Sequence, residues 1–224
     1  MSYIAEPLGR LLQMVYGVVG NYGISIIIFT ILVKLVMIPL TIKQTKSMKN
    51  MQEIQPKIKA IQTKYANDKE KMNEKVMELY KENNVNPFGG CLPLLIQFPI
   101  IIGLFTVLRQ PENYGFAKEI VDAGFLWMPS LSAPDPWVLP LLAGATTYLS
   151  SKTMSASKSG GGGQQEGMQK MMLYFFPLMI IWWGRSFPAG LTLYWVVSNL
   201  FQTGQQLAIN RPAALLRNKG SEAK

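Results

Sequence analysis

The residue with the clearest chemical potential in this sequence is Lys34, a cation within an apolar run. Residues 26–40 are apolar except for Thr30, Lys34 and Pro39. A lysine at the centre of a membrane helix costs about 2.5–3.5 kcal/mol, and such residues usually face a bundle interior or a water-filled cavity. The alternative is snorkelling, in which the side chain extends along the helix towards the membrane surface. The other long apolar stretches contain no acidic residue that could neutralise Lys34.

Other polar and aromatic side chains in the apolar stretches could line a hydrophilic groove together with Lys34. Thr30 lies one helical turn before Lys34 and shares its face. The remaining candidates are Gln97, Ser150, Ser151, Thr192, Tyr194, Trp195, Ser198, Asn199 and Gln202. Taken singly, each would also be explained by a hydrogen bond between packed membrane helices. A groove therefore requires that several of them meet.

The residue types of enzymatic sites are missing. The chain has no histidine, which removes the commonest general base and the commonest metal ligand. The single cysteine, Cys91, therefore has no histidine to activate it. Its simpler role is that of a small apolar side chain packed in the protein. The apolar stretches hold no carboxylate pair, and the glycines near Gly163 lack the phosphate-binding pattern. The sequence predicts no enzyme, no cofactor and no metal site.

The composition indicates the elements that would carry these residues. Hydrophobic residues make up 49% of the 224-residue chain and charged residues only 16%, against about 25% charged in soluble domains. Several apolar stretches approach the roughly 20 residues that cross a bilayer as a helix. We therefore predict an all-α integral membrane protein with five transmembrane helices around a groove open to the cytoplasm. The predicted spans are residues 21–42, 90–108, 137–151, 170–184 and 188–209.

The segments between these spans have distinct characters. Residues 1–20 are predicted to form an amphipathic helix at the membrane surface. In residues 43–86, apolar residues recur every three or four positions on each side of Asn67 and Asp68, which predicts an antiparallel helical hairpin in the cytoplasm. The remaining segments are an external loop (109–136), a cytoplasmic Gly-rich loop (152–169) and a basic cytoplasmic tail (210–224).

The distribution of Lys and Arg predicts the orientation. Ten of the 22 cations lie in the hairpin, three in and beside the Gly-rich loop, and four in the tail. Only Arg10, Arg109, Lys118 and Arg185 fall on the opposite side. Since cytoplasmic segments carry the excess of Lys and Arg, the N-terminus is predicted outside and the C-terminus in the cytoplasm of a bacterial cell.

Three stretches carry a resemblance to a known family. The sequence NPFGGCLPLLIQFPI at residues 86–100 resembles the second-span signature of the YidC/Oxa/Alb membrane protein insertases. The sequence FPAGLTLYW at 187–195, with Ser198 and Asn199, is similar to their last-span motif, and residues 33–51 and 55–58 are similar to their first span and hairpin. Without a large outer domain or an extra N-terminal span, the chain looks like the short form of Gram-positive bacteria.

The resemblance implies a function and a set of site residues. Members of this family help nascent membrane proteins enter the bilayer from the cytoplasm, without nucleotide hydrolysis, through a groove that holds an arginine. Lys34 matches that arginine and keeps the charge without the bidentate guanidinium. Serine, near Ser150 or Ser151, stands where a glutamine is common. The implied contacts with a passing substrate helix are Thr30, Phe98, Ile101, Tyr194 and Trp195.

Implied partners are nascent membrane proteins and membrane lipids, with the Sec translocon, the signal recognition particle machinery and the ribosome as further candidates. Two other function classes stay open. A small anion or solute transporter or channel would use Lys34 as an anion site, although the inverted repeats common in transporters are not visible. A membrane-anchored scaffold for ribosomes or RNA would use the hairpin, whose ten lysines and six acids leave a net charge of only +4. We expect no nucleic-acid specificity.

Overall fold

The structure is a computed structural model that describes residues 2–85, 92–155, 167 and 170–221. Within these ranges the chain forms helices, turns and one isolated bridge between Phe125 and Met128, which confirms the all-α class. The predicted break at 86–90, Cys91 and most of the Gly-rich loop lie outside the described residues. The longer helices are α1 (Ser2–Val19), α2 (Tyr22–Lys64), α3 (Lys69–Glu82), α4 (Leu92–Arg109), α6 (Val138–Ser155), α8 (Phe176–Gly184) and α9 (Ala189–Ser221). The short elements are η2 (Pro111–Tyr114), α5 (Lys118–Val121) and the π-helical turn η3 (Met171–Phe175).

Helix α2 runs without interruption from the first apolar stretch into the hairpin. The Asn21 side chain caps its start by accepting a hydrogen bond from the Ile24 amide at 3.0 Å. At 1.5 Å per residue its 43 residues extend about 65 Å, roughly twice the hydrocarbon thickness of a bilayer. The predicted boundary between residues 42 and 43 therefore falls inside one helix. The change from apolar to lysine-rich sequence alters the surroundings that the helix prefers but does not end it, and Pro39 and Pro56 also lie inside the helix.

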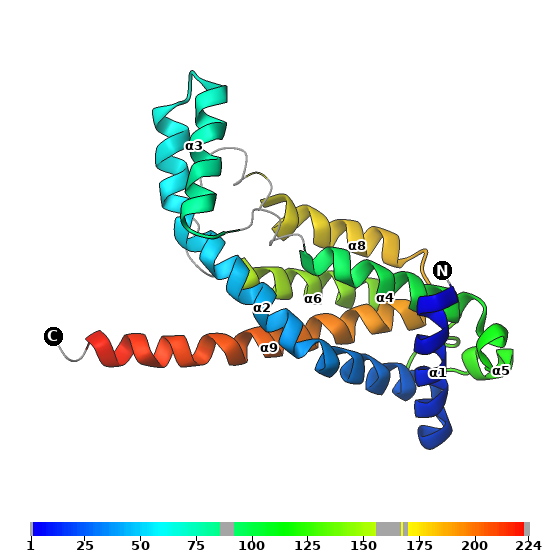
Figure 1. The fold of residues 1–224 in the computed structure, drawn as a ribbon. Helices are drawn as coiled ribbons and strands as arrows, with labels where there is room; N and C mark the ends of the chain where they lie inside the picture. Colours follow the sequence, from blue (N-terminus) through cyan, green and yellow to red (C-terminus); the bar gives the residue numbers. More distant parts are fainter. Residues whose placement is uncertain (1, 86–91, 156–166, 168–169, 222–224) are drawn as a thin grey trace.

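Helix α3 folds back on the distal half of α2 and completes the hairpin (Figure 1). Asp68 caps its start by accepting a hydrogen bond from the Lys71 amide at 3.0 Å. A small apolar cluster joins the two helices, formed by Ile54, Ile58, Leu79 and Val85 with Met51, Ile61, Val76 and Tyr80 around it. Apart from this seam the hairpin surface is mainly polar, and it projects away from the other helices.

The proximal half of α2 packs with α4, α6, α8 and α9 into a bundle, and α1 lies across one end of it (Figure 1). A continuous apolar core joins these helices and includes Phe29, Leu104 and Leu139, each 0–1% exposed. Helix α9 is tied to the loop that precedes α6, because the amides of Ala189 and Gly190 donate to the carbonyls of Ala133 and Leu131, each at 2.9 Å. The bundle therefore fixes the directions in which α2, α6 and α9 present their polar residues.

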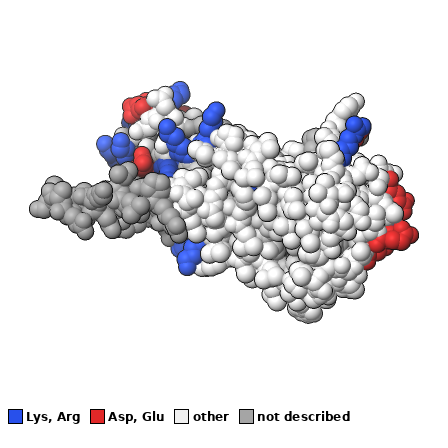
Figure 2. All heavy atoms as spheres, turned by 90° about the horizontal axis from the view of Figure 1, so that it is seen from below, with Lys and Arg blue, Asp and Glu red and all other residues white. Residues whose placement is uncertain are grey.

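The outer surface of the bundle is apolar. Large side chains such as Val36, Leu178, Trp182 and Leu200 are at least half exposed. Figure 2 shows a broad surface without charged side chains between two ends where Lys, Arg, Asp and Glu gather. Of the described helices, α2 is long and apolar enough to cross a membrane by length and composition, and 97–109 and 171–184 form shorter apolar helices. Such a surface would be unfavourable in water and is typical of a protein surrounded by lipid.

Candidate functional site

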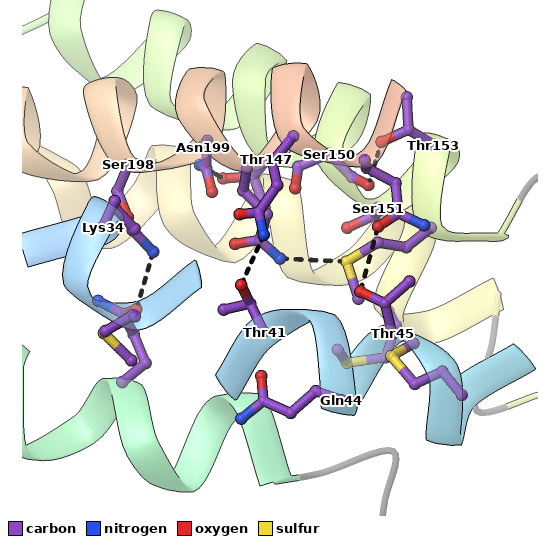
Figure 3. A pocket seen from close by; sticks show the side chains of 18 of the residues that line it. Lys34, Thr41, Gln44, Thr45, Thr147, Ser150, Ser151, Thr153, Ser198 and Asn199 are labelled. Atoms are coloured by element: carbon purple, nitrogen blue, oxygen red, sulfur yellow. Dashed lines mark hydrogen bonds between the residues drawn. The ribbon is translucent and has the colours of Figure 1, made fainter. Parts of the chain in front are cut away.

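A polar cavity of about 200 Å³ opens between α2, α6 and α9, with single residues from α4 and α8 completing its wall. We call it the polar cavity. Figure 3 shows Lys34 and Ser198 together at one end, with Thr45, Ser151 and Thr153 towards the other. From α2 it receives Lys34, Met37, Thr41, Gln44, Thr45, Met48, Lys49 and Gln52. From α6 and α9 it receives Thr147, Ser150, Ser151, Thr153, Met154, Trp195, Ser198, Asn199, Gln202, Gln205 and Gln206.

Lys34 begins a chain of hydrogen bonds across three helices. Its ammonium donates to Gln97 Oε1 on α4 at 3.2 Å, and Gln97 Nε2 donates to the hydroxyl of Tyr194 on α9. The Ser198 hydroxyl is a second partner of the Tyr194 hydroxyl. Lys34 is only 6% exposed, so its ammonium points into the bundle and does not extend along the helix surface as snorkelling would require. The neutral amide of Gln97 orients the cation and leaves its charge uncompensated.

The charge of the cavity is positive. Among the described residues that line it, Lys34 and Lys49 are cations and none is Asp or Glu. Hydroxyl and amide groups supply most of its other polar surface. A cavity of this kind can solvate a polar chain segment and attract a carboxylate, but its described lining lacks the nucleophile–base pairs of hydrolytic sites.

Side-chain hydrogen bonds brace the mouth of the cavity between helices that are distant in sequence. Gln205 on α9 donates to Thr41 on α2 at 2.6 Å, and Thr45 donates to Gln206 at 3.4 Å. Gln52 donates to the Met154 carbonyl at the end of α6, at 3.2 Å. These contacts hold the proximal part of α2 against α6 and α9.

The structure gathers part of the predicted residue set around the polar cavity. Lys34, Gln97, Ser150, Ser151 and Trp195 line it directly. Tyr194 is fully buried behind the lining and reaches the cavity through Gln97.

Four predicted residues lie elsewhere, and one of them, Thr192, lines the second cavity together with Ile101. Thr30 is 0% exposed, and its hydroxyl donates to the Ile26 carbonyl of its own helix at 2.6 Å, as threonine in a helix commonly does. Phe98 is 52% exposed on the outer surface of α4. Ile101 lines a second, apolar cavity further along α4.

Sequence reasoning named Ser198, Asn199 and Gln202 on α9 but missed Gln205, Gln206 and the α2 side of the mouth, although a periodic signal for them existed. On α2, Lys34, Met37, Thr41, Gln44 and Met48 follow one another at spacings of three and four, which places them on one face of a helix. On α9 the same spacing links Trp195 to Gln206 through four intervening polar positions. Thr41 and Thr45 were overlooked because the predicted boundary at residue 42 cut the α2 face in two.

Comparison with known proteins places the chain in a family. The sequence profile described as 60Kd inner membrane protein matches residues 14–216. The chain belongs to this family. A relative from Fusobacterium nucleatum is 46% identical over 219 residues, covering 96% of this chain and 100% of the relative. One from Caldanaerobacter subterraneus is 40% identical over 220 residues, covering 98% of this chain and 100% of the relative. Both carry the name membrane protein insertase YidC.

Longer members of the family match most of this chain over one part of their own length. A Geobacter YidC insertase is 41% identical over 93% of this chain, which spans 37% of that relative. A crystal structure of an active YidC insertase with its first transmembrane domain resolved matches with a TM-score of 0.68 and 30% identity. That match covers 91% of this chain and 45% of the solved one. The resemblance read from the sequence motifs is thereby confirmed at the level of family and fold.

Proposed function

We propose that this protein is a membrane protein insertase, which helps nascent membrane proteins enter the bilayer from the cytoplasm. The observation that carries the proposal is the placement of Lys34, a cation held by Gln97 inside a polar cavity of an otherwise apolar bundle. Burying a charge inside an apolar bundle costs free energy, and ionisable residues in membrane helices mark functional sites. Membership in a family whose relatives are named insertases indicates the function of this one.

The proposal includes a topology of five transmembrane helices. The proximal half of α2, α4, α6, the η3–α8 segment and the first two-thirds of α9 would cross the membrane, with α1 at the outer surface. The broad surface without charged side chains in Figure 2 and the apolar segments of α2, α4 and α8 support it. The charge distribution then places the N-terminus outside and the hairpin and C-terminal tail in the cytoplasm of a bacterial cell.

In this topology the polar cavity is a groove facing the cytoplasm. The polar flank of a nascent segment enters it and is solvated by hydroxyl and amide groups, while Lys34 attracts its carboxylates. The apolar part of the segment moves into the adjacent lipid, and hydrophobic partitioning drives the transfer without nucleotide hydrolysis. Membrane lipids are direct partners. The Sec translocon, the signal recognition particle machinery and the ribosome are candidate partners for delivery.

Site-specific crosslinking tests the proposal directly. A photoreactive residue at position 34 or 195 is expected to crosslink to a stalled nascent membrane protein in reconstituted vesicles. The same residue at Val18, which is 88% exposed on α1, serves as the control for nonspecific proximity. Equal crosslinking from all three positions would contradict the proposal. Solute flux through purified protein, in the absence of any client, would instead favour the transporter alternative.

A further inference from the structure

The polar cavity ends at a wall, beyond which lies a second cavity of different character. The second cavity has a volume of about 190 Å³ and lies between α4, α6, α8 and α9. We call it the apolar cavity, because residues such as Ile102, Phe105, Ile180 and Leu191 line it. It is nearer the ends of α4 and α8 that carry Arg109 and Gly184, whereas the polar cavity is nearer the hairpin.

Trp195 forms the boundary between the two cavities. It is the side chain shared by both sets of described lining residues. Its ring packs against Phe176 of α8, with centroids 6.4 Å apart, and its indole N–H donates to Thr147 Oγ1 on α6 at 2.9 Å. The position of this boundary therefore depends on one hydrogen bond to α6 and one ring contact to α8.

The Thr147 hydroxyl uses its full hydrogen-bonding capacity at this boundary. It donates to the Ala143 carbonyl at 2.6 Å and accepts from Trp195 Nε1 and Asn199 Nδ2, each at 2.9 Å. A hydroxyl has one proton to donate and two lone pairs to accept with, so all three are engaged. Ala143 lines the apolar cavity and Asn199 lines the polar one. Thr147 thus ties the linings of both cavities to the boundary residue.

We propose that Thr147 is a positioning residue that holds Trp195 as a closed wall, so that water and polar chain segments in the polar cavity stop before the apolar cavity. The inference rests on the proposed function, in which a polar segment occupies the polar cavity. Without the Thr147 oxygen, the part-buried indole N–H would lose its acceptor on α6, and the ring would turn towards another acceptor. Turning the ring would join the two cavities.

Accessibility of a cysteine in the apolar cavity tests the wall without any client protein. Thr192 lines the apolar cavity, so Thr192→Cys is introduced in a Cys91→Ser background and reconstituted in vesicles. A charged, membrane-impermeant maleimide is added and the labelling rate is measured. We expect slow labelling with Thr147 present and about tenfold faster labelling with Thr147→Val, the change in open population that loss of one hydrogen bond allows.

A neighbouring threonine supplies a matched control. Thr146 donates within its own helix to Leu142 and Ala143, at 2.8 and 3.1 Å, and accepts a longer bond from Asn199 Nδ2 at 3.5 Å, but makes no hydrogen bond to Trp195. Thr146→Val is therefore expected to leave the labelling rate unchanged, and Thr147→Ser, which keeps a hydroxyl, is expected to restore slow labelling. Trp195→Phe removes the donor and keeps a ring, so it should accelerate labelling as Thr147→Val does, which gives a second test should the valine variant not fold.

Two results would contradict the proposal that Thr147 holds Trp195 as a closed wall. One is a Thr147→Val rate equal to that of the parent, and the other is equal acceleration by Thr146→Val, which would indicate general loosening of α6. Because labelling needs no client, a failure here leaves the crosslinking result untouched. Conversely, absent crosslinking from positions 34 and 195 would reject the insertase function even where the wall is present.

Discussion

At the scale of single residues, Lys34 offers a positive charge without the fixed two-point hydrogen-bonding geometry that an arginine would add. The ammonium is a point charge that one neutral amide orients, at 3.2 Å. It attracts a carboxylate without the fixed two-point geometry of a guanidinium. Charge should therefore matter more than the shape of the side chain at this position.

Lys34→Ala is expected to lower the insertion of small membrane proteins with acidic outer tails by about tenfold, the scale of one hydrogen bond to a charged group. Lys34→Arg is expected to retain most of the activity. Insertion into proteoliposomes, followed by protease protection of the outer tail, gives the measurement. Lys49→Ala removes a second lining cation and is the matched control, with a smaller expected effect since Lys49 lies nearer the mouth. Undiminished insertion by the Lys34→Ala protein would rule out this role.

The sequence predicted which residue types belong in the site better than which of them meet. A lysine in an apolar run carries a recognisable free-energy cost, so the sequence alone singles out Lys34. The sequence alone does not identify its partner, because the bond joins positions 63 residues apart and depends on how α2 and α4 are rotated. Thr30 misled for a related reason: it shares the face of Lys34, but the deeper turn of that face is packed against the core. The spacing of residues shows which of them share one face of a helix. How far the polar cavity extends along that face depends on packing against the other helices.

At the scale of elements, the hairpin depends on a thin apolar seam. Helix α3 has 14 residues, a length at which isolated helices are marginal in water. Its attachment rests on the small cluster that includes Ile58 and Leu79. Separation of α3 from α2 should therefore require little free energy, and the hairpin should open locally while the bundle stays folded.

Leu79→Ala is expected to destabilise the packing of α3 by about 2 kcal/mol, because it deletes the most buried α3 side chain of the seam. Hydrogen exchange should show loss of amide protection in α3 and in residues 51–64 of α2, with no change in α6 or α9. Met77→Ala, at a position that is 48% exposed on the same helix, is the control. Uniformly strong protection of α3 in the Leu79→Ala protein would contradict a thin seam.

The loop before α6 is a second element with a measurable weakness, because the Asp122 carboxylate joins its beginning to two serines further along it. Asp122 accepts hydrogen bonds from the hydroxyls of Ser132 and Ser130, the latter at 3.1 Å, and these bonds lower the pKa of its carboxyl. The same loop provides the carbonyls that hold the first amides of α9. Protonation of Asp122 should therefore loosen the start of the helix that carries Tyr194 and Trp195.

The sign of the pH effect follows from the direction of the pKa shift. A carboxyl whose pKa is lower in the folded state stabilises the fold above its unfolded pKa of about 3.9 and loses that contribution as the pH falls below it. We expect thermal stability of the loop to be flat from about pH 7 to 5 and to fall towards pH 3. Asp122→Asn should be less stable at pH 7 and should lack this component of the acid dependence. Parallel acid profiles of the two proteins would show that Asp122 is not responsible.

The helical elements themselves were largely predictable, and their ends were not. Apolar stretches and three–four spacing predicted the apolar helices and the helical hairpin, since both signals depend on local sequence. The continuity of α2 through residue 43, of α6 to Ser155 and of α9 to Ser221 was not foreseen. A helix ends where its backbone groups form other hydrogen bonds or where a helix-breaking residue occurs. The prediction instead ended these helices where hydropathy changed.

At the scale of the whole molecule, charge and apolar surface are arranged along one direction. Charged side chains gather at the two ends of the described structure and a wide uncharged surface separates them (Figure 2). The hairpin end is rich in lysine, whereas Glu112, Glu119 and Asp122 lie in the loop at the opposite end. The excess of lysine at the hairpin end is the part of this arrangement that bears on membrane orientation, because Lys and Arg, and not Asp and Glu, set it.

Cysteine accessibility in intact cells and in inverted vesicles measures that orientation. In a Cys91→Ser background, Glu112→Cys in η2 is expected to react with an impermeant maleimide in intact cells, because the proposed topology places this loop outside. Lys59→Cys in the hairpin segment of α2 is expected to react only in inverted vesicles, because lysine-rich segments stay in the cytoplasm. The two positions control for each other, since each should label in one preparation and not in the other. Labelling of Lys59→Cys in intact cells would show that the topology is the reverse of the proposed one. The polar cavity would then open away from the compartment in which nascent chains are made.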